Sequence, residues 1–318
     1  MSSKSFIKLI ENSDTFAGLK RQASENTLAH CVLFISQDQL HINLIAQMLA
    51  RFVLGLDTQK LDEFNADIHL VGTADKMVAS DIDSMLDGLL IKSSKGNKKI
   101  YLMPAFHTLR LDIQSKLLKT LEEPLFGTHF LLGALSEKST PAPILSRART
   151  IALNNFASVD IYNSLLDGAT GSLDGIKLAS EISGGTLTAV YNFLTDKNYS
   201  LSFNASLKTL KNALSSKEVL DSVLALSNFK DYTKSIFDYL ELILRDTLMQ
   251  HIGASHLIRL KSIKGDIEKL TQIFSIKAIE NIILFINKSR RRREFNANFN
   301  SLIDELVFKI VEFKVKYQ

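Results

Sequence analysis

Short apolar runs that alternate with helical patterns constrain the fold of this chain more than any other feature. They follow one another between residues 29 and 153 and carry many β-branched and aromatic residues. The five runs are HCVLFI (30–35), ADIHLVG (66–72), KIYLM (99–103), THFLLGAL (128–135) and RTIAL (149–153). Because helical stretches such as 41–54 and 111–122 separate them, we expect a parallel sheet with helices on both faces.

The remainder of the chain has a different pattern. After residue 155 it is helical, broken at SGGT (183–186), and the last of the four prolines is Pro143. Long helices therefore meet no proline in this half. With 318 residues, of which 46% are hydrophobic, the chain is long enough for two or three domains. We expect an α/β domain over 1–155, a small helical domain over 156–200 and a larger helical domain over 201–318.

Composition excludes several kinds of site. The single cysteine, Cys31, rules out an internal disulfide and a zinc site built on paired cysteines. His30 and His41 have no acidic or cysteine partner at metal-ligand spacing, so we expect ordinary hydrogen bonds there and no metal or cofactor. The formal charge of +4 permits nucleic-acid contact without requiring it. No secretion signal or membrane span is evident, which predicts a cytoplasmic protein without a membrane partner.

One segment resembles a known family. LLKTLEEP (117–124), followed by THFLLGALSEKSTPAPILSRA (128–148), resembles the DNA polymerase III clamp-loader subunits, whose AAA+ domains carry a Leu-Glu-Glu-Pro helix end, a strand and a Ser-Arg-Cys motif. Ala148 stands where the family usually has cysteine. The closest type is delta prime, although the zinc-binding cysteines of many delta prime sequences are missing here. The resemblance implies an α/β AAA+ module, a small helical lid and an all-α collar.

The residues that hold nucleotide in the family are replaced in this chain. After the first strand the family has a Gly-x-x-x-x-Gly-Lys-Ser/Thr loop, whose amides and lysine hold phosphates. SQDQLHIN (36–43) occupies that position, with neither glycine nor lysine and with Asn43 in place of the Mg²⁺-binding hydroxyl. Pro104 and Ala105 stand where an acidic pair would bind Mg²⁺ and orient water.

The other nucleotide contacts of the family are missing as well. Thr188, in GTLT (185–188), replaces the lid arginine that reaches the nucleotide. Ala134 and Leu135 stand where a polar residue follows the fourth strand. These independent losses predict a degenerate nucleotide site, no intrinsic ATPase activity and no bound cofactor.

An arginine is retained where the family places a catalytic one. Arg147 in ILSRAR corresponds to the arginine finger that projects into the ATP site of the adjacent subunit, and Ser146 is expected to support it. A planar guanidinium stabilises the charge that develops on a transferred phosphoryl group. The alternatives are an ordinary ion pair or helix-end contact, or Arg149 as the finger. Glu122 and Glu123 point about 100° apart on a helix, so we expect structural roles for them rather than acid/base catalysis.

Two helices near the end of the chain resemble the family's collar. They are FDYLELILRDTLM (237–249), with its Arg-Asp pair, and NANFNSLIDELVFKI (296–310). Leu302, Leu306 and Ile310 fall on one helical face and are predicted to be buried in a bundle or an oligomeric collar. The run KSRRRR (288–293) predicts either phosphate contacts or a solvated helix junction, and the role of Arg290–Arg293 stays open.

The function that the resemblance implies is that of a non-hydrolysing, delta prime-like clamp-loader subunit. Such a protein acts in a hetero-oligomer within the DNA polymerase III holoenzyme, with gamma/tau-type ATPase subunits and the delta subunit, and loads the sliding clamp onto primed DNA. The alternatives are an ATP-hydrolysing gamma/tau-type subunit, the clamp-opening delta subunit, and a stand-alone DNA-binding protein.

Overall fold

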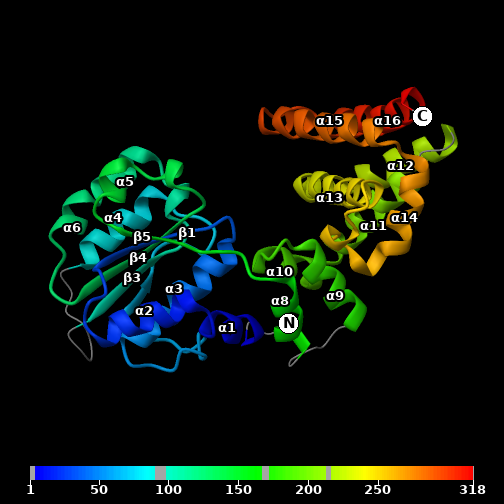
Figure 1. Cartoon of the computed structure of the whole chain (residues 1–318). Coiled ribbons are helices and arrows are strands. Elements are labelled where there is room, and N and C mark those ends of the chain that lie inside the picture. Colours follow the sequence, from blue (N-terminus) through cyan, green and yellow to red (C-terminus); the bar gives the residue numbers. More distant parts are fainter. Residues whose placement is uncertain (1–3, 90–97, 167–171, 213–215, 318) are drawn as a thin grey trace. The chain divides into compact units, whose positions relative to one another are not determined.

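The computed structural model describes residues 4–89, 98–166, 172–212 and 216–317. Contacts group the chain into two compact units, Met1–Ala169 with Gly184–Thr188, and Thr170–Ser183 with Ala189–Gln318. We call the first the α/β unit and the second the helical unit (Figure 1). This grouping does not test the boundaries expected at 155 and 200, which stay predictions.

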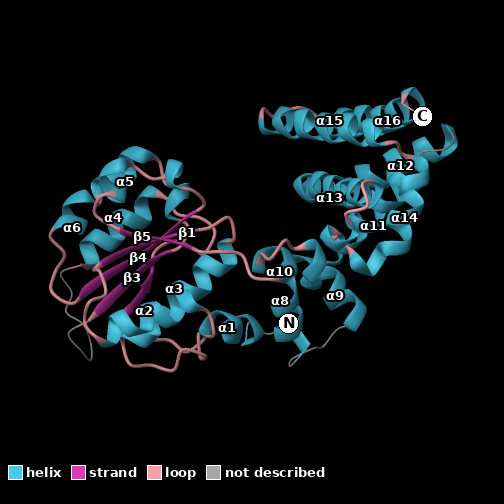
Figure 2. Ribbon diagram, in the orientation of Figure 1, coloured by secondary structure: helices cyan, strands magenta, loops and turns pink. Residues whose placement is uncertain are grey.

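The α/β unit is built on a five-stranded parallel sheet with the strand order β2-β3-β4-β1-β5 (Figure 2). Its strands are β1 (Cys31–Ile35), β2 (Ile68–Leu70), β3 (Lys99–Met103), β4 (Thr128–Ala134) and β5 (Arg149–Ala152). Each lies inside one of the five apolar runs, so the predicted strands and their parallel arrangement are confirmed. Val32 pairs with both Leu131 of β4 and Arg149 of β5, which places β1 between these two strands.

Both faces of the sheet are buried, which is why the strands read as almost continuous apolar runs. Alternate side chains of three strands face one core; they are Cys31, Leu33, Tyr101, Met103, Phe130, Leu132 and Ala134. Ile82, Met85 and Leu121, from the helices on that side, complete this core. The intervening side chains point to the other face, where α3 packs against β3 and β4.

The helices of this unit surround the sheet. Their bounds are α1 (Lys4–Glu11), α2 (Asp14–Ser24), α3 (Gln39–Val53), α4 (Ala79–Gly88), α5 (Leu111–Lys116), α6 (Leu118–Glu122), α7 (Ala142–Leu145) and α8 (Ser158–Leu166), with short 3₁₀ turns η1 (Phe106–Thr108) and η2 (Glu137–Ser139). The helix expected over 111–122 is divided at Leu117, a correction to the sequence-based prediction. There the amide of Leu117 bonds to the carbonyl of Gln114, three residues back, which tightens the chain between α5 and α6.

The helical unit holds the described helices that follow α8, apart from the first residues of α10. The bounds are α9 (Leu173–Ile182), α10 (Leu187–Thr195), α11 (Lys197–Lys211), α12 (Ser216–Ser227), α13 (Thr233–His251), α14 (Lys264–Ile273), α15 (Ile276–Glu294) and α16 (Phe299–Lys316), with 3₁₀ turns η3 (Lys230–Tyr232), η4 (Ser255–Leu257) and η5 (Lys261–Ile263). The first residues of α10 group with the α/β unit. α13 contacts α11, α14 and α15, and α16 packs on α12 and α15. The described residues of this half contain no strand, as the sequence predicts.

Leu302, Leu306 and Ile310 are all buried on one face of α16, which confirms the predicted apolar stripe. They are buried within the chain's own helical unit, against α12 and α15. Asn298 begins this helix as its N-cap and accepts from the amide of Ser301.

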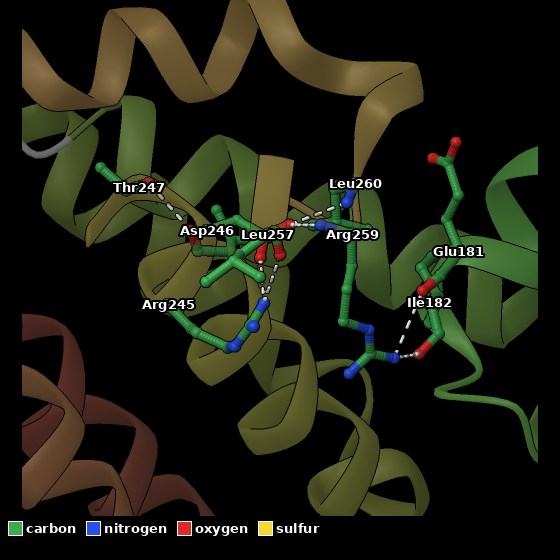
Figure 3. A network of polar contacts seen from close by, with 9 residues as sticks. Glu181, Ile182, Arg245, Asp246, Thr247, Leu257, Arg259 and Leu260 are labelled. Atoms are coloured by element: carbon green, nitrogen blue, oxygen red, sulfur yellow. Dashed lines mark hydrogen bonds and ion pairs between the residues drawn. The ribbon is translucent and has the colours of Figure 1, made fainter. Parts of the chain in front are cut away.

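The Arg-Asp pair of α13 is part of a polar network inside the helical unit (Figure 3). Asp246 is completely buried, and its carboxylate accepts from the amides of Arg259 and Leu260 at 2.9 and 2.7 Å and from Arg245 Nη1 at 2.6 Å. Arg259 Nη2 in turn donates to the carbonyls of Glu181 and Ile182, the last residues of α9. The motif therefore joins α13 to the C-terminal end of α9 and satisfies carbonyls that the helix leaves free.

Within the part of the chain that the structure describes, no single helix is long and apolar enough to cross a membrane; one bent pair, Lys261–Ile273 with Ile276–Glu294, meets that test only in combination.

Candidate functional site

The connection between β1 and α3 is a short turn. β1 ends at Ile35 and α3 begins at Gln39, so only residues 36–38 lie between them. Residues 39–43, which the resemblance assigns to the second half of a phosphate-binding loop, are already in the first turns of α3. The turn therefore lacks the extended backbone that wraps a phosphate in such loops.

Asp38, the last residue of this turn, makes several of its hydrogen bonds. It is the N-cap of α3, only 1% exposed, and its carboxylate accepts from the amide of His41 at 3.2 Å. The same carboxylate accepts from the amides of Leu187 and Thr188 and from the hydroxyl of Thr188 at 2.6 Å. An anion supplied by the chain itself thus lies between the N-terminal ends of α3 and α10, where helix dipoles favour negative charge.

The amides at the start of α3 are bonded to side chains of the same chain. The amide of Leu40 donates to Thr188 Oγ1 at 3.0 Å, and that of His41 donates to Asp38. A phosphate-binding helix offers these groups to its ligand. Here the Thr188 hydroxyl accepts from the amide of Leu40 and the Asp38 carboxylate accepts from that of His41, so neither amide is free to receive a phosphate.

The neighbouring positions are filled by close packing. Gln39 Nε2 donates to the carbonyl of Pro104 at 2.9 Å and to that of Ala74 at 2.8 Å. Ala105 is buried, and a Cβ placed on Gly133 would lie 2.3 Å from the carbonyl oxygen of Pro104. The position that the resemblance assigns to an acidic pair is therefore occupied by Pro104 and Ala105 with the Gln39 amide against them, and these groups offer no carboxylate to Mg²⁺.

The two histidines have ordinary roles. His30 Nε2 lies 2.8 Å from the carbonyl oxygen of Leu121, the kind of hydrogen bond that the sequence predicts. His41 is buried against the ring of Phe156, at 4.8 Å between ring centroids, and its Nε2 has no hydrogen-bond partner among the described residues. Burial lowers the pKa of His41 to about 4, against the opposing charge of Asp38. Among residues 4–89, 98–166, 172–212 and 216–317, no group of three or more His, Cys, Asp or Glu could hold a metal ion.

Arg147 lies at the surface between α7 and β5, with 36% of its side chain exposed. Its Nε donates to Glu122 Oε1 at 2.6 Å, and its Nη2 contacts the same oxygen. Its Nη1 donates to the carbonyl of Pro143 at 2.9 Å and to Ser146 Oγ at 3.0 Å. Ser146 thus contacts Arg147 directly, and Glu122 has the structural role expected for it. An ion pair and a helix-end contact were the alternative to an arginine finger, and Arg147 makes both within its own chain. The finger role itself stays a prediction.

Arg147 and the β1–α3 turn lie at opposite edges of the sheet. Arg147 precedes the first residue of β5, whereas the turn follows the last residue of β1, and the two strands are parallel with Val32 paired to Arg149. The four residues of β5 alone span about 13 Å at the usual rise of a strand. Arg147 is therefore remote from its own chain's Asp38 turn, and any phosphate that it contacts must come from elsewhere.

The basic run at the end of α15 is largely engaged within the helical unit. Arg290 Nη2 lies 2.8 Å from both Asp238 Oδ1 and Glu241 Oε2 on α13. Arg292 pairs with Glu305 of α16. Two of the four arginines therefore connect helices. This pattern favours the helix junction over a continuous phosphate-binding strip.

Comparison with known proteins finds relatives of this chain, and the family match lies in the α/β unit. Residues 11–157 match the family described as DNA polymerase III, delta subunit. The DNA polymerase III subunit gamma of Buchnera aphidicola subsp. Schizaphis graminum is 28% identical over 147 residues, or 45% of this chain and 40% of that protein. The tau/gamma subunit of Haemophilus influenzae is 27% identical over 175 residues, or 51% of this chain and 25% of that protein. The α/β unit is thus homologous to DNA polymerase III subunits.

The extent of the match differs between the curated relatives and a solved structure. The chain spans less than half the length of these curated relatives. A DNA polymerase III gamma subunit-related protein from Thermotoga maritima has the same fold, with a TM-score of 0.52 at 16% identity, covering 95% of this chain and 100% of that one. The fold class expected from the sequence, a parallel α/β module followed by helices, is confirmed.

The degenerate nucleotide site stays a prediction. The sequence-based interpretation treated Thr188 only as the replacement of the lid arginine and gave no role to Asp38 or Gln39, so it missed the hydrogen bonds that these three residues make. One local signal was available for Asp38, because an aspartate directly before an apolar helical pattern is a typical N-cap. Nothing local indicates that the same carboxylate also bonds to Leu187 and Thr188.

Proposed function

We propose that this chain is a non-hydrolysing, delta prime-like subunit of the DNA polymerase III clamp loader. Homology of the α/β unit to DNA polymerase III subunits supports the general assignment. The observation that supports the specific assignment is the buried Asp38 carboxylate, which accepts from the amide of His41, while the Thr188 hydroxyl accepts from the amide of Leu40. The chain then contributes to ATP-driven clamp loading without turning over ATP itself.

Electrostatics supports the absence of nucleotide binding. Two unit charges 4 Å apart interact with about 4 kcal/mol at the effective dielectric constant of ~20 that suits protein sites. A triphosphate at this turn would face the buried Asp38 carboxylate with that repulsion, and no lysine follows in α3 before Arg51 to offset it. Mg·ATP binding is therefore disfavoured even though the surrounding fold is retained.

Arg147 is the residue that we expect to act in catalysis, in trans. Its place at the opposite edge of the sheet from the Asp38 turn suits a role at a neighbour's ATP site, with Ser146 supporting the guanidinium. The partners are then gamma/tau-type ATPase subunits and the delta subunit, and the complex loads the sliding clamp onto primed DNA.

An ATP-hydrolysing gamma/tau-type subunit is the second candidate, because the curated relatives that match carry the names gamma and tau. A calorimetric titration of the isolated chain with Mg·ATP, together with a phosphate-release assay, separates the two. We expect no measurable binding and no turnover. Low-micromolar affinity with turnover would establish the second candidate instead.

The finger is tested in the assembled complex. Arg147→Ala should leave assembly intact and reduce DNA- and clamp-stimulated hydrolysis, by roughly 10³- to 10⁵-fold at the one ATP site that it serves. The overall loss is smaller when other sites keep working. Arg147→Lys should restore little, because an ammonium lacks the planar fork. Arg149→Ala is the positional control, and unchanged hydrolysis with Arg147→Ala would remove the finger role.

A further inference from the structure

Almost all hydrogen-bonding capacity of Arg147 is used within its own chain. A guanidinium has five N–H donors. Nε and Nη2 both contact Glu122 Oε1, and Nη1 bonds to Pro143 O and Ser146 Oγ. The edge of the guanidinium formed by Nε and Nη2, which would receive a phosphate as a fork, therefore faces a carboxylate.

The surroundings favour a cation at this point. Glu122 is the last residue of α6, and Pro143 lies in α7, which contacts α6. The C-terminal ends of helices carry partial negative charge, and the Glu122 carboxylate adds a full one. Arg147 is thus held by two features that attract positive charge. A carboxylate left at this helix end without the arginine would be unfavourably placed.

We propose that Glu122 is the resting counter-ion of Arg147, and that the terminal phosphate of a nucleotide bound to a neighbouring subunit must displace it before Arg147 engages. This inference rests on the proposed function, because it concerns the regulation of the same arginine. Glu122 acts through Arg147 and is a positioning residue. The carboxylate and the phosphate compete for the same N–H groups. The strength of the Arg147–Glu122 ion pair therefore determines the ATP concentration at which Arg147 exchanges Glu122 for the phosphate.

The solvent exposure of Arg147 and Glu122 limits how strongly their ion pair can oppose phosphate binding. The Arg147 and Glu122 side chains are 36% and 45% exposed. Exposed ion pairs are weak, contributing roughly 1.4- to 5-fold to an equilibrium. Release of Arg147 is therefore a modest barrier, which suits a contact that must open and close in each catalytic cycle.

The test uses the reconstituted complex and two adjacent glutamates. Glu122→Gln removes the charge and keeps the shape, and Glu123→Gln is the matched control because the adjacent Glu123 is exposed and Arg147 pairs with Glu122. We expect Glu122→Gln to lower the ATP concentration for half-maximal hydrolysis roughly two- to five-fold with little change in kcat. Glu122→Asp, which retains a carboxylate, should behave more like the wild type. In an Arg147→Ala background Glu122→Gln should have no effect.

Three results would count against the proposal, and they differ from one another. If Arg147→Ala lowers hydrolysis but Glu122→Gln behaves like Glu123→Gln, the resting-pair inference is wrong and the finger role stands. If Glu122→Gln lowers kcat at an unchanged half-maximal concentration, Glu122 orients the arginine instead of retaining it. If Arg147→Ala has no effect in an assembled complex, the proposed function fails first.

Discussion

The carboxylate of Asp38 accepts hydrogen bonds from both the amide and the hydroxyl of Thr188, at 3.1 and 2.6 Å, although the two residues are 150 positions apart. In the sequence, Asp38 lies in the segment that the resemblance aligns with a phosphate-binding loop, and Thr188 stands where it places the lid arginine. In the structure the two residues form one arrangement, in which the Asp38 carboxylate accepts from Thr188 and the Thr188 hydroxyl accepts from the amide of Leu40. The two side chains therefore depend on each other for hydrogen-bond partners.

Asp38→Asn should loosen this arrangement. An asparagine side chain offers one uncharged acceptor oxygen and places N–H donors towards amides that need an acceptor, so at least one buried amide loses its partner. We expect about 2 kcal/mol of local destabilisation. Native-state hydrogen exchange should then be about 30-fold faster at the amides of Leu187 and Thr188. Gln37→Ala, at an exposed residue of the same turn, should leave both rates unchanged; equal rates in Asp38→Asn would show that the carboxylate is dispensable.

His41 should make the α/β unit less stable in mild acid. Its pKa is lowered from 6.5 to about 4 by burial, so the unfolded chain takes up a proton at a higher pH than the folded chain. The contribution of neutral His41 to stability is present above pH 6.5 and is lost as the pH falls towards 4. Between pH 7 and pH 5 this lowers the free energy of unfolding by about 2 kcal/mol.

The His41 effect is measured by urea unfolding at several pH values. His41→Leu should flatten the pH dependence relative to the wild type, whereas His256→Gln, at an exposed histidine, should not. A histidine resonance of His41 that titrates near pH 6.5 in the folded protein would contradict the prediction.

Two glycine-to-alanine substitutions should have opposite effects. At Gly133 the new Cβ would lie 2.3 Å from the Pro104 carbonyl oxygen and from Ile42 Cγ2, so β4, Pro104 or α3 must move. We expect a loss of about 1 to 3 kcal/mol. At Gly18, inside α2, nothing lies within 4 Å, and alanine should stabilise the helix by up to about 1 kcal/mol. Calorimetric melting of both variants tests the pair, and a Gly133→Ala protein as stable as the wild type would disprove the close packing.

Neighbouring arginines of α15 should differ in their effect on stability. Arg290 bonds to Asp238, Glu241 and Asn287, whereas Arg291 is exposed and forms no ion pair with any residue that the structure describes. Because the carboxylates are partly exposed, Arg290→Ala should cost about 1 kcal/mol, and Arg291→Ala should stay within about 0.5 kcal/mol. Thermal denaturation compares them. Equal melting temperatures would mean that the α13–α15 link does not stabilise the helical unit.

Local pattern was sufficient for much of the fold. The runs that became β1 to β5 were recognisable because a parallel sheet buries both faces and so requires apolar residues at consecutive positions. The stripe of Leu302, Leu306 and Ile310 was recognisable because helical periodicity places these residues on one face. The division of the helix at Leu117 could not be predicted, because it depends on one hydrogen bond to Gln114 that the residue types do not indicate.

The sequence by itself determined the division into an α/β half and a helical half; the degenerate nucleotide site and the role of Arg147 stay predictions from the resemblance. Only the tertiary structure decided that Asp38 bonds to Thr188, that Gln39 reaches Pro104 and that Arg147 pairs with Glu122. The reason is physical. Apolar periodicity is a property of neighbouring residues, whereas a buried polar group takes whichever partner the fold brings within about 3 Å, and that partner can come from any part of the chain.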